Sequence, residues 1–538
     1  MKSFDYIIVG AGASGCVVAN RLSADPKVTV CLIEAGGSNK QPWVSIPAGV
    51  FISYNNKNHD FKYQGAPQKH LNNRVITVNR GKGLGGSTSI NNMVYIRGNR
   101  KDYDTWEQLG CEGWSYDDVL PVFKKLEKNE VGQSPEFHGF DGEVTVVKPQ
   151  DTNKVGQLFV SAGEHIGLPE NTDFNGKTQL GLGTFNLKQK NGERVSSYTA
   201  FVKPVLDSRS NLTVMTNTEV LSLNIEGDNV TSIKIEQNGE AKVLQCNKEV
   251  ILSSGVISSP RILMASGIGN ADELKELGIE CKKDLKGVGE NLQDHIDSMV
   301  TVRSNSASSI GVSLRTLLPH VIPAPFKYIL KRMGWWTTNY TEVGGFAKTK
   351  FAEQANDDPD IQFHFTPLYR SHRGKSFEFG HGYSIFTCVL RPQSKGTVKL
   401  ANDGTHRNVI IDYNFFAKEQ DQKVLIEGVK KAREVLASPV FDEKRGKEMA
   451  PGKDVQTDEE ILEYLKQTTT TVYHPVGTCK MGIDEMAVVD PKSLKVIGMN
   501  NLRVIDASIM PKLISGNTSA PSMMIGEMGS MMILRDNF

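Results

Sequence analysis

The sequence predicts an α/β fold, α+β overall, in which a parallel βαβ unit at the start of the chain is joined to a large antiparallel sheet. A β-branched run at residues 4–9 ends at a glycine cluster, and helical apolar spacing and a second such run at 28–33 follow it. Much later, the apolar runs at 360–365, 383–390 and 396–400 have the length and composition of antiparallel strands. His364, inside the first of these runs, is interpreted as a sheet residue.

Size, charge and cysteine content exclude several classes of protein. The chain has 538 residues, enough for roughly three or four domain equivalents. Lys and Arg number 62 against 61 Asp and Glu, and a net charge of +1 gives no reason to expect a nucleic-acid partner. The seven cysteines include no CxxC pair, which favours free thiols in a reducing compartment. With no signal peptide and no apolar run of about 18 residues, we expect a cytoplasmic protein, either soluble or peripheral to a membrane.

The first glycine cluster has GxGxxG spacing within a strand–turn–helix context. Gly10 follows the first strand and allows a tight turn, Gly12 lets the backbone approach a pyrophosphate, and Gly15 lets the helix pack on the sheet. Glu34 ends the second strand, where its carboxylate would accept both ribose hydroxyls. These residues predict a Rossmann-like dinucleotide site, and they do not separate FAD from NAD.

A second glycine-rich stretch, residues 80–93, leads without a polar spacer into the apolar run 93–96. Flexible linkers do not usually end in this way. We therefore favour a nest of backbone N–H groups that contacts phosphate or ring oxygens.

Four blocks of the sequence resemble signatures of the glucose-methanol-choline (GMC) oxidoreductase family. They are GKGLGGSTSINNMVYIRGNRKDYD at 81–104, GVISSPRILMASGIG at 255–269, GVGENLQDH at 287–295 and YHPVGTCKMG at 473–482. The resemblance extends over essentially the whole chain and is greatest to FAD-dependent alcohol dehydrogenases of the choline-dehydrogenase and medium-chain alkanol type. It implies a Rossmann-like FAD-binding domain and a substrate domain built on a large antiparallel sheet.

The resemblance also implies domain limits and cofactor contacts. We expect 1–155, 195–300 and 470–538 to form the FAD-binding domain, and 156–194 and 301–469 to form the substrate-binding domain. The expected FAD-binding residues, with Val220 at the adenine and Asp506 and Ala507 on the flavin side, are Gly10, Gly12, Ala13, Ser14, Gly15, Glu34, Ala35, Arg80, Gly81, Gly86, Ser87, Asn91, Asn92, Met93, Val94, Val220, Asp506, Ala507 and Thr518.

Three positions depart from the family pattern. Ile90 stands where some members carry the histidine that bonds covalently to FAD, so we expect FAD to be bound non-covalently. Asn92 replaces a common glycine and Val256 a usually smaller residue, and both changes concern local loop geometry. No metal is expected.

His474 and Asn517 are the expected catalytic pair. Oxidising an alcohol removes a proton from oxygen and a hydride from carbon, and flavin N5 would accept the hydride. The proton requires a base that titrates near working pH, and His474 is held in a turn by Pro475 and Gly477. Asn517, where the family has His or Asn, would bond the same oxygen. A helix starting near Pro521 would direct its positive end at the flavin pyrimidine edge.

Residues 314–336 combine apolar positions at helical spacing with basic residues, and two tryptophans stand at one end. This composition fits contact with a membrane interface, here the inner face of the cell membrane. Three prolines interrupt the pattern, which favours a substrate lid or a helix packed on the protein. Both interpretations stay open.

The leading expectation for the reaction is oxidation of a primary, aliphatic or otherwise apolar alcohol to the aldehyde. Electrons would pass to a quinone or an artificial acceptor, and not to oxygen. Choline is the nearest rival substrate, because Trp335, Trp336, Tyr340 and Glu342 are candidates for a cationic cage. A sugar or polyol is also open, and so, more remotely, is a non-redox lyase that keeps FAD. The sequence does not fix the physiological alcohol, the natural acceptor or the oligomeric state.

Overall fold

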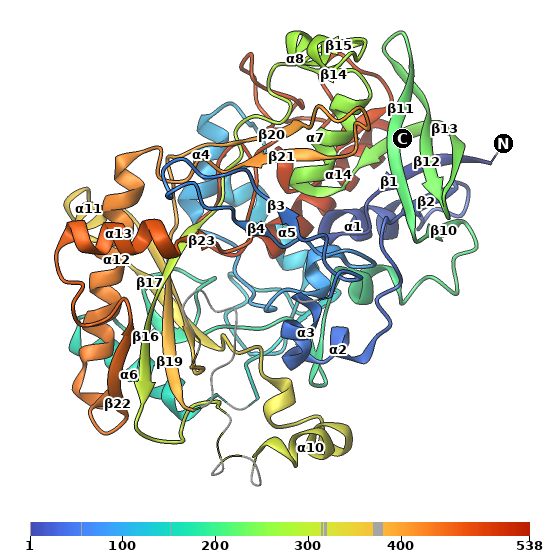
Figure 1. The fold of residues 1–538 in the computed structure, drawn as a ribbon. Coiled ribbons are helices and arrows are strands. Elements are labelled where there is room, and N and C mark those ends of the chain that lie inside the picture. The colour runs from blue at the N-terminus through green and yellow to red at the C-terminus, as the bar shows by residue number, and fades with distance from the viewer. Residues whose placement is uncertain are drawn as a thin grey trace.

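Two seven-stranded sheets organise the molecule and lie in different parts of it (Figure 1). The N-terminal strand is part of the first sheet, at the upper right of the view, and the C-terminal helix lies next to that sheet. The computed structural model describes residues 2–54, 56–150, 152–311, 313, 316, 320–369 and 380–537.

The first sheet has a parallel core and an antiparallel extension. Its strands are β1 Ser3–Val9, β2 Val30–Ile33, β10 Leu212–Met215, β11 Thr218–Glu226, β12 Asn229–Gln237, β13 Glu240–Leu252 and β24 Leu502–Val504. The order is β10-β2-β1-β13-β12-β11, with β24 beside β13. β10, β2, β1, β13 and β24 pair in parallel, and β11, β12 and β13 form an antiparallel meander. The predicted parallel βαβ unit is therefore present.

Glycines set how the first and last helices meet. Helix α1, Ala13–Leu22, packs against α14, Ser519–Asn537. A Cβ on Gly15 would lie 1.9 Å from the carbonyl oxygen of Gly10, and a Cβ on Gly526 would lie 2.8 Å from that of Ser14. Because neither position has room for a side chain, glycine allows α1 to approach both the fingerprint loop and α14. The end of the chain thus returns to the nucleotide-binding unit.

The second sheet is antiparallel throughout. Its strands are β7 Gly181–Thr184, β16 Ile296–Ser304, β17 Val343–Ala347, β18 Ile361–Thr366, β19 Gly382–Val389, β22 Arg445–Ala450 and β23 Thr470–Thr471. The order is β22-β16-β19-β18-β17-β7, with β23 beside β16. Helices α6 Lys154–His165, α12 Glu419–Ala437 and α13 Asp458–Thr468 contact its strands. The expected domain limit at 300 falls inside β16, and the domain division itself stays a prediction.

Two local expectations differ from the structure. The alternating sequence of residues 211–220 predicts one strand, but Asn217 has a φ of 51° and turns the chain between β10 and β11. The strand predicted at 396–400 is present as β20, Thr397–Leu400, but it lies outside the large sheet. It pairs with β21, Val409–Asp412, and its Val398 N–H donates to the carbonyl oxygen of Gly289.

The remaining elements are short. None of the helices in the described ranges has the length and apolar character needed to cross a membrane. All seven cysteines are free. The other helices and strands are α2 Pro42–Ser45, α3 Val50–Tyr54, α4 Arg100–Gln108, α5 Tyr116–Leu126, α7 Gly255–Ala265, α8 Ala271–Glu276, α10 Ala324–Lys331, α11 Lys350–Gln354, β3 Tyr63–Gln64, β4 Thr77–Val78, β5 Glu127–Asn129, β6 Val144–Val146, β8 Gln189–Lys190, β9 Glu193–Arg194, β14 Ile268–Gly269 and β15 Lys283–Asp284, with a π-helical turn at Tyr198–Val202.

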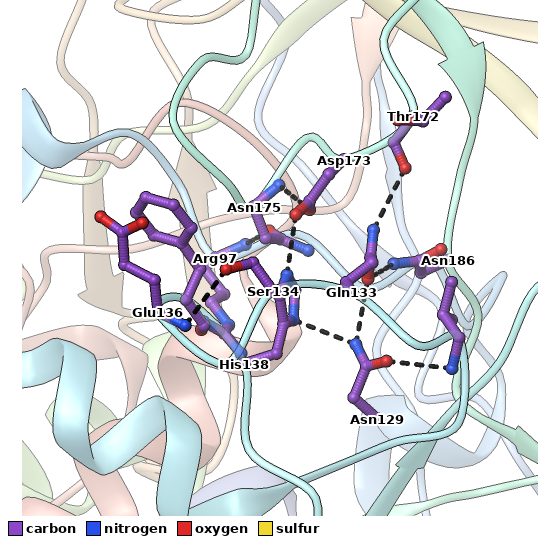
Figure 2. Close-up of polar contacts among 12 residues, drawn as sticks. Arg97, Asn129, Gln133, Ser134, Glu136, His138, Thr172, Asp173, Asn175 and Asn186 are labelled. Carbon is purple, nitrogen blue, oxygen red and sulfur yellow. Dashed lines mark hydrogen bonds and ion pairs between the residues drawn. The ribbon is translucent and has the colours of Figure 1, made fainter.

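A buried polar network joins segments that are expected to lie in different domains. Figure 2 shows His138 between Asn129 and Asp173. His138 Nδ1 lies 3.0 Å from Glu127 Oε2, its Nε2 lies 2.9 Å from Asp173 Oδ2, and Glu127 also pairs with Arg97. Burial lowers the pKa of His138, but the hydrogen bonds to Asp173 and Glu127 outweigh it and raise that pKa above its ordinary value. The buried charges are therefore paired, as their desolvation requires.

Candidate active site

The two glycine-rich loops lie directly against each other. Gly85 N–H donates to the carbonyl oxygen of Ala11 over 2.8 Å, and a Cβ on Gly86 would lie 2.9 Å from the Cα of Gly12. Gly86 has a φ of 51°, a left-handed conformation that glycine adopts without strain. Gly12 and Ala13 are partly exposed, and no side chain caps the first turn of α1. This arrangement leaves N–H groups at a helix start available to an anion, as a nucleotide pyrophosphate requires.

Glu34 follows β2 and lies buried between the two loops. Its Oε1 accepts from the N–H groups of Gly36 at 2.8 Å and Gly83 at 2.9 Å, and its Oε2 accepts from Ala11 at 3.1 Å. The carboxylate therefore joins the two loops, in addition to its expected contact with ribose. Ala35, the next expected contact, is half-buried beside it.

Arg80 connects the second loop to the segment that carries the expected base. Its Nη2 donates to Ser87 Oγ over 2.7 Å, and its Nη1 donates to the carbonyl oxygen of Tyr473 over 3.0 Å. Ser87 Oγ also accepts from Gly81 N–H at 3.1 Å. Since Tyr473 precedes His474, one side chain spans the expected cofactor loop and the expected base.

Residues 91–94 are held in place by their own side chains and by Arg194. Asn91 Oδ1 accepts from Met93 N–H and from Arg194 Nη1, each at 3.0 Å. Asn92, where a glycine is common, has no positive φ, whereas Met93 has a φ of 61°. The asparagine therefore replaces glycine without left-handed strain. Met93 and Val94 are buried.

Asp506 has protein partners for both carboxylate oxygens. Oδ2 accepts from Gly255 N–H at 2.9 Å and from Ser259 Oγ at 2.6 Å, and Oδ1 accepts from Ser508 N–H at 2.8 Å. Burial raises the pKa of Asp506, and these hydrogen bonds oppose the shift. The side chain thus fixes the start of α7 beside the segment that carries Ala507.

The other expected cofactor contacts are also placed. Val220 is buried in β11, and its carbonyl oxygen accepts from Arg261 Nη2 at 2.7 Å. Thr518, half-buried, precedes α14, and Ser522 Oγ donates to its carbonyl oxygen over 2.7 Å. Ser14 Oγ donates to the carbonyl oxygen of Ser522 over 2.6 Å, so the starts of α1 and α14 adjoin.

The structure brings His474 and Asn517 into contact. Asn517 Nδ2 lies 3.1 Å from His474 Nε2. Gln362 Nε2 donates to Asn517 Oδ1 over 3.3 Å, which leaves the amide nitrogen of Asn517 facing the imidazole. His474 is 9% exposed and Asn517 is half-buried. The Asn517 amide donor and the His474 imidazole nitrogen therefore meet in a largely buried position.

His295 determines which nitrogen of His474 carries the proton. His295 Nε2 lies 3.0 Å from the carbonyl oxygen of Ile514 and 3.2 Å from that of Leu390, and carbonyl oxygens accept only. His295 Nε2 is therefore protonated, and its Nδ1 is an acceptor. His474 Nδ1 lies 2.9 Å from that acceptor and must donate to it. In a neutral His474 ring, Nε2 is then the unprotonated nitrogen, and its lone pair accepts from Asn517 Nδ2.

The pKa values keep these rings neutral. Burial, with His295, His364 and Arg80 as further causes, holds the pKa of His474 well below its ordinary value. Burial also lowers the pKa of His295 to about 3 and that of His364 to about 4. At neutral pH each ring is uncharged, so the tautomers derived from the hydrogen bonds apply.

The backbone around His474 is held by the preceding residues of the His295 segment. Asp294 Oδ1 accepts from the backbone N–H of His474 at 2.9 Å, and its Oδ2 accepts from the hydroxyl of Thr471. Burial raises the pKa of Asp294 to about 7, against the effect of these bonds. Val476 and Gln293 form an antiparallel bridge. The two segments thus position the ring together.

Sequence reasoning did not assign a role to His295 or His364. His295 lies in one of the family-like blocks, but its partner is 179 positions away. His364 is a sheet residue as expected, in β18, yet its ring also hydrogen-bonds Asn517. It lies two positions from Gln362 and so on the same face of the strand, which is the one signal available in the sequence.

An apolar cluster adjoins the pair. A Cβ on Gly516 would lie 2.5 Å from Ile96 Cγ2 and 3.9 Å from Phe346 Cζ. The ring of Phe185 lies 5.9 Å from that of His364. The cluster consists of Val94, Ile96, Phe174, Phe185, Leu187, Phe346 and Leu390.

A Rossmann-like unit with two glycine loops, a second antiparallel sheet and a buried His–Asn pair define a dinucleotide-dependent oxidoreductase. The sequence model of the GMC oxidoreductase family matches residues 4–297 with its N-terminal part and 392–526 with its C-terminal part. The chain belongs to the GMC oxidoreductase family. The family and the fold class expected from the sequence are thereby confirmed, and the chain is an enzyme that uses FAD.

Individual relatives cover almost the whole chain. It is 42% identical to an alcohol dehydrogenase (acceptor) from Pseudomonas putida, over 99% of this chain and 96% of the relative. It is 38% identical to an oxygen-dependent choline dehydrogenase from Chromohalobacter salexigens, over 97% and 93%. Among solved structures, pyridoxine 4-oxidase from Mesorbium loti has a TM-score of 0.88 at 27% identity, over 99% of both chains. A formate oxidase has a TM-score of 0.91 at 26% identity, over 99% of this chain and 98% of the other.

Proposed function

We propose that this enzyme oxidises a primary, apolar alcohol to the aldehyde, with His474 as the general base and FAD as the hydride acceptor. The observation that carries the proposal is the unprotonated Nε2 of His474, whose tautomer is fixed by His295 and whose neighbour is the Asn517 amide. The name of the Pseudomonas putida relative, an alcohol dehydrogenase (acceptor), supports it.

His474 and Asn517 act on the same oxygen. Their Nε2 and Nδ2 atoms are 3.1 Å apart, close enough for one hydroxyl oxygen of a bound alcohol to contact both. His474 Nε2 takes the hydroxyl proton, and Asn517 Nδ2 donates a hydrogen bond that stabilises the developing alkoxide. The protonated ring keeps its Nδ1–H bond to His295 and therefore does not rotate away. FAD, when bound, supplies the acceptor for the hydride that leaves the alcohol carbon.

The residues of the nucleotide site fit FAD. Among the described residues, a Cβ on Gly12 would have one heavy-atom neighbour within 4 Å, the carbonyl oxygen of Ser253 at 3.9 Å, so the space beside this glycine is open to a ligand. The N–H groups at the start of α1 would hold the diphosphate, and Glu34 would hold the ribose. We propose that FAD is bound non-covalently, because Ile90 offers no nucleophile. Acid precipitation should then leave a yellow supernatant, and a yellow pellet would contradict non-covalent binding.

The surroundings of the pair favour an apolar alcohol over choline. Gly516, which precedes Asn517, packs on the apolar cluster. Two members of the candidate cationic cage have other partners, because Trp335 stacks on His320 at 4.9 Å and Trp336 packs against Tyr328 at 5.9 Å. Choline stays the second candidate on account of the 38% identical choline dehydrogenase.

Anaerobic mixing of the yellow holoenzyme with candidate alcohols tests the reaction. Bleaching of the flavin absorbance by 1-alkanols, with weaker bleaching by choline or a sorbose-like polyol, is the expected result. Faster bleaching by choline would identify choline as the better substrate. Persistent colour with every alcohol, together with cleavage of a cyanohydrin, would replace oxidation with lyase activity.

We also propose that electrons pass to a quinone or another acceptor that is not oxygen, and that α10 contacts the inner face of the cell membrane. Ala324 and Tyr328 face the protein, whereas Phe326, Ile329 and Leu330 are 65%, 68% and 79% exposed. Figure 1 shows α10 at the outer edge of the molecule, below both sheets. This exposed apolar face supports the membrane interpretation over a lid. Leu314, Leu317 and Leu318, from the same expected segment, lie outside the described residues.

The charge of this region complements an anionic bilayer. Lys327 and Lys331 are exposed on α10, and the sequence from 298 to 341 has no Asp or Glu. Basic side chains beside an apolar helical face are typical of interfacial helices. From α10 the chain leads to Asn339, whose Nδ2 donates to the carbonyl oxygen of Asn92 over 2.6 Å. The same segment therefore connects the exposed face to the expected cofactor loop.

Sedimentation with vesicles tests the membrane contact. The protein should sediment with vesicles of phosphatidylglycerol and phosphatidylcholine, and less with phosphatidylcholine alone. The double substitution Ile329→Asp and Leu330→Asp should abolish binding, whereas Ile483→Asp, at an apolar residue 77% exposed elsewhere, should not. Equal binding by all variants would refute the assignment. Dimers in light scattering that the double substitution dissociates would identify the face as a contact between copies of the chain.

A further inference from the structure

Lys188 is a buried lysine that has no acidic partner in the part of the chain that the structure describes. Its side chain is 1% exposed, and its Nζ donates to the hydroxyl of Ser519, the first residue of α14. Among the residues that the structure describes, no carboxylate oxygen lies within ion-pair distance of this Nζ. Burial, with Arg194 as a second cause, lowers the pKa of Lys188 to about 7. An unpaired buried ammonium is costly to the fold, so a reason for its presence is needed.

Arg194 adds a second positive charge beside it. The guanidinium is 5% exposed, and its Nε and Nη1 donate to carbonyl oxygens of Val44 and Thr88 at 3.0 and 3.4 Å, and to Asn91. These oxygens accept hydrogen bonds but carry no net charge. Fully buried arginines elsewhere have carboxylates, as Arg97 has with Glu127. Within the described ranges, the positive charges of Lys188 and Arg194 therefore have no carboxylate partner, whereas that of Arg97 has one.

The two cations lie where the cofactor loop meets the start of α14. Lys188 N–H donates to the carbonyl oxygen of Met93 over 2.9 Å. Ser519 follows Thr518 and Asn517, and it is partly exposed although Lys188 is not. A hydroxyl that accepts from an ammonium still has its own proton to donate to a ligand. The N-terminal end of α14, where the helix dipole is positive, lies in the same place and adds to the positive charge of Lys188 and Arg194.

We propose that Lys188 is a positioning residue which, through Ser519, stabilises the negative charge that the isoalloxazine ring of bound FAD gains on reduction. The inference rests on the proposed FAD site and deepens it. A hydride brings two electrons and one proton to the neutral ring and leaves it with one negative charge. The hydroxyl proton of the alcohol goes to His474, and the aldehyde leaves uncharged, so atoms and charge balance. Lys188 supplies the countercharge on the side of α14.

The diphosphate of FAD is another anion within reach of this region, because the starts of α1 and α14 adjoin. The two sources predict different results. A lysine that serves the diphosphate changes FAD retention, and the reduction potential of the retained FAD stays the same. A lysine that serves the reduced ring changes the potential and leaves FAD retention intact. The exposure of Ser519 beside Asn517 favours the ring.

Dye-coupled potentiometry of the holoenzyme, without alcohol, tests the proposal. Lys188→Met should lower the equilibrium constant for two-electron reduction at least tenfold, which is about 30 mV. It should also weaken formation of the flavin–sulfite adduct, while FAD content stays at the wild-type level. Lys190→Met, the same change at an exposed lysine two positions along, should alter neither quantity. Because no alcohol is used, the result does not depend on the proposed substrate or base.

An unchanged potential in Lys188→Met, or loss of FAD with an unchanged potential in the remainder, would overturn the proposal. If that variant does not fold, the pH dependence of the reduction potential of the wild-type enzyme tests the proposal instead. Above pH 7 reduction should draw an extra proton onto Lys188, so the potential should fall with pH about twice as steeply as below pH 7. A single slope from pH 6 to pH 9 would refute the role of Lys188.

Discussion

Replacing His295 by leucine removes the acceptor that holds the proton of His474 on Nδ1. His474 Nδ1–H would then be a buried donor without its partner at 2.9 Å. Such a donor costs about 1–3 kcal/mol. The ring escapes this penalty by moving the proton to Nε2 or by rotating, and both changes occupy or misdirect the lone pair that takes the alcohol proton.

The same energy gives the size of the effect. A shift of 1.36 kcal/mol changes a population or a rate tenfold, so about 1–3 kcal/mol reduces the active tautomer roughly 5- to 150-fold. The rate of flavin reduction by a 1-alkanol should fall by this factor in His295→Leu. His295→Asn places an amide oxygen near the position of the lost Nδ1 and should retain most of the rate.

Anaerobic stopped-flow absorbance measures both variants against the wild-type enzyme, with FAD content determined first. A merely structural role for His295 would lower stability or FAD content equally in both variants and would not separate their rates. Reduction by His295→Leu at the wild-type rate, with FAD bound, would refute the assignment of tautomers.

Three further results are expected. Asn517→Ala should lower the flavin reduction rate about 10²- to 10³-fold with little change in KM, as loss of an oxyanion donor does; steady-state kinetics will show whether KM changes instead. Because burial holds the pKa of His474 well below its ordinary value, kcat/KM should not decline between pH 8 and pH 6, and an acid limb near pH 7 would contradict a neutral base. The raised pKa of His138 stabilises the fold fully below its ordinary value of 6.5 and less as pH rises through the folded-state value. His138→Gln should therefore lower the free energy of unfolding, by about 1–3 kcal/mol, more at pH 6 than at pH 9 in urea titrations, and an equal loss at both would disprove this sign.

Local patterns made the nucleotide half of the molecule predictable. Gly10, Gly12 and Gly15 each meet a local steric requirement of one strand–turn–helix, so their spacing alone predicts that structure. His474 was predicted from a block that resembles a known family, and Asn517 from a position where that family has His or Asn; the structure shows that the two side chains meet. The expected membrane segment was harder to interpret, because its prolines interrupt the period that a helix would show.

Other features depend on contacts between distant parts of the chain. His295 acquires its role from carbonyl oxygens of Leu390 and Ile514, which no local pattern connects to it. Lys188 lies in a polar stretch that resembles a surface loop, and its burial follows from packing against Met93 and Ser519. Similarly, β20 lies outside the large sheet, where it pairs with β21 and where Val398 N–H donates to the carbonyl oxygen of the distant residue Gly289.

The role of His474 is decided by the rate at which a 1-alkanol reduces bound FAD in His474→Ala. Loss of a general base should slow this step by about 10²- to 10⁴-fold, while the variant keeps its FAD and its fold. A variant that is fully loaded with FAD and bleaches as fast as the wild-type enzyme would show that the alcohol proton is taken elsewhere.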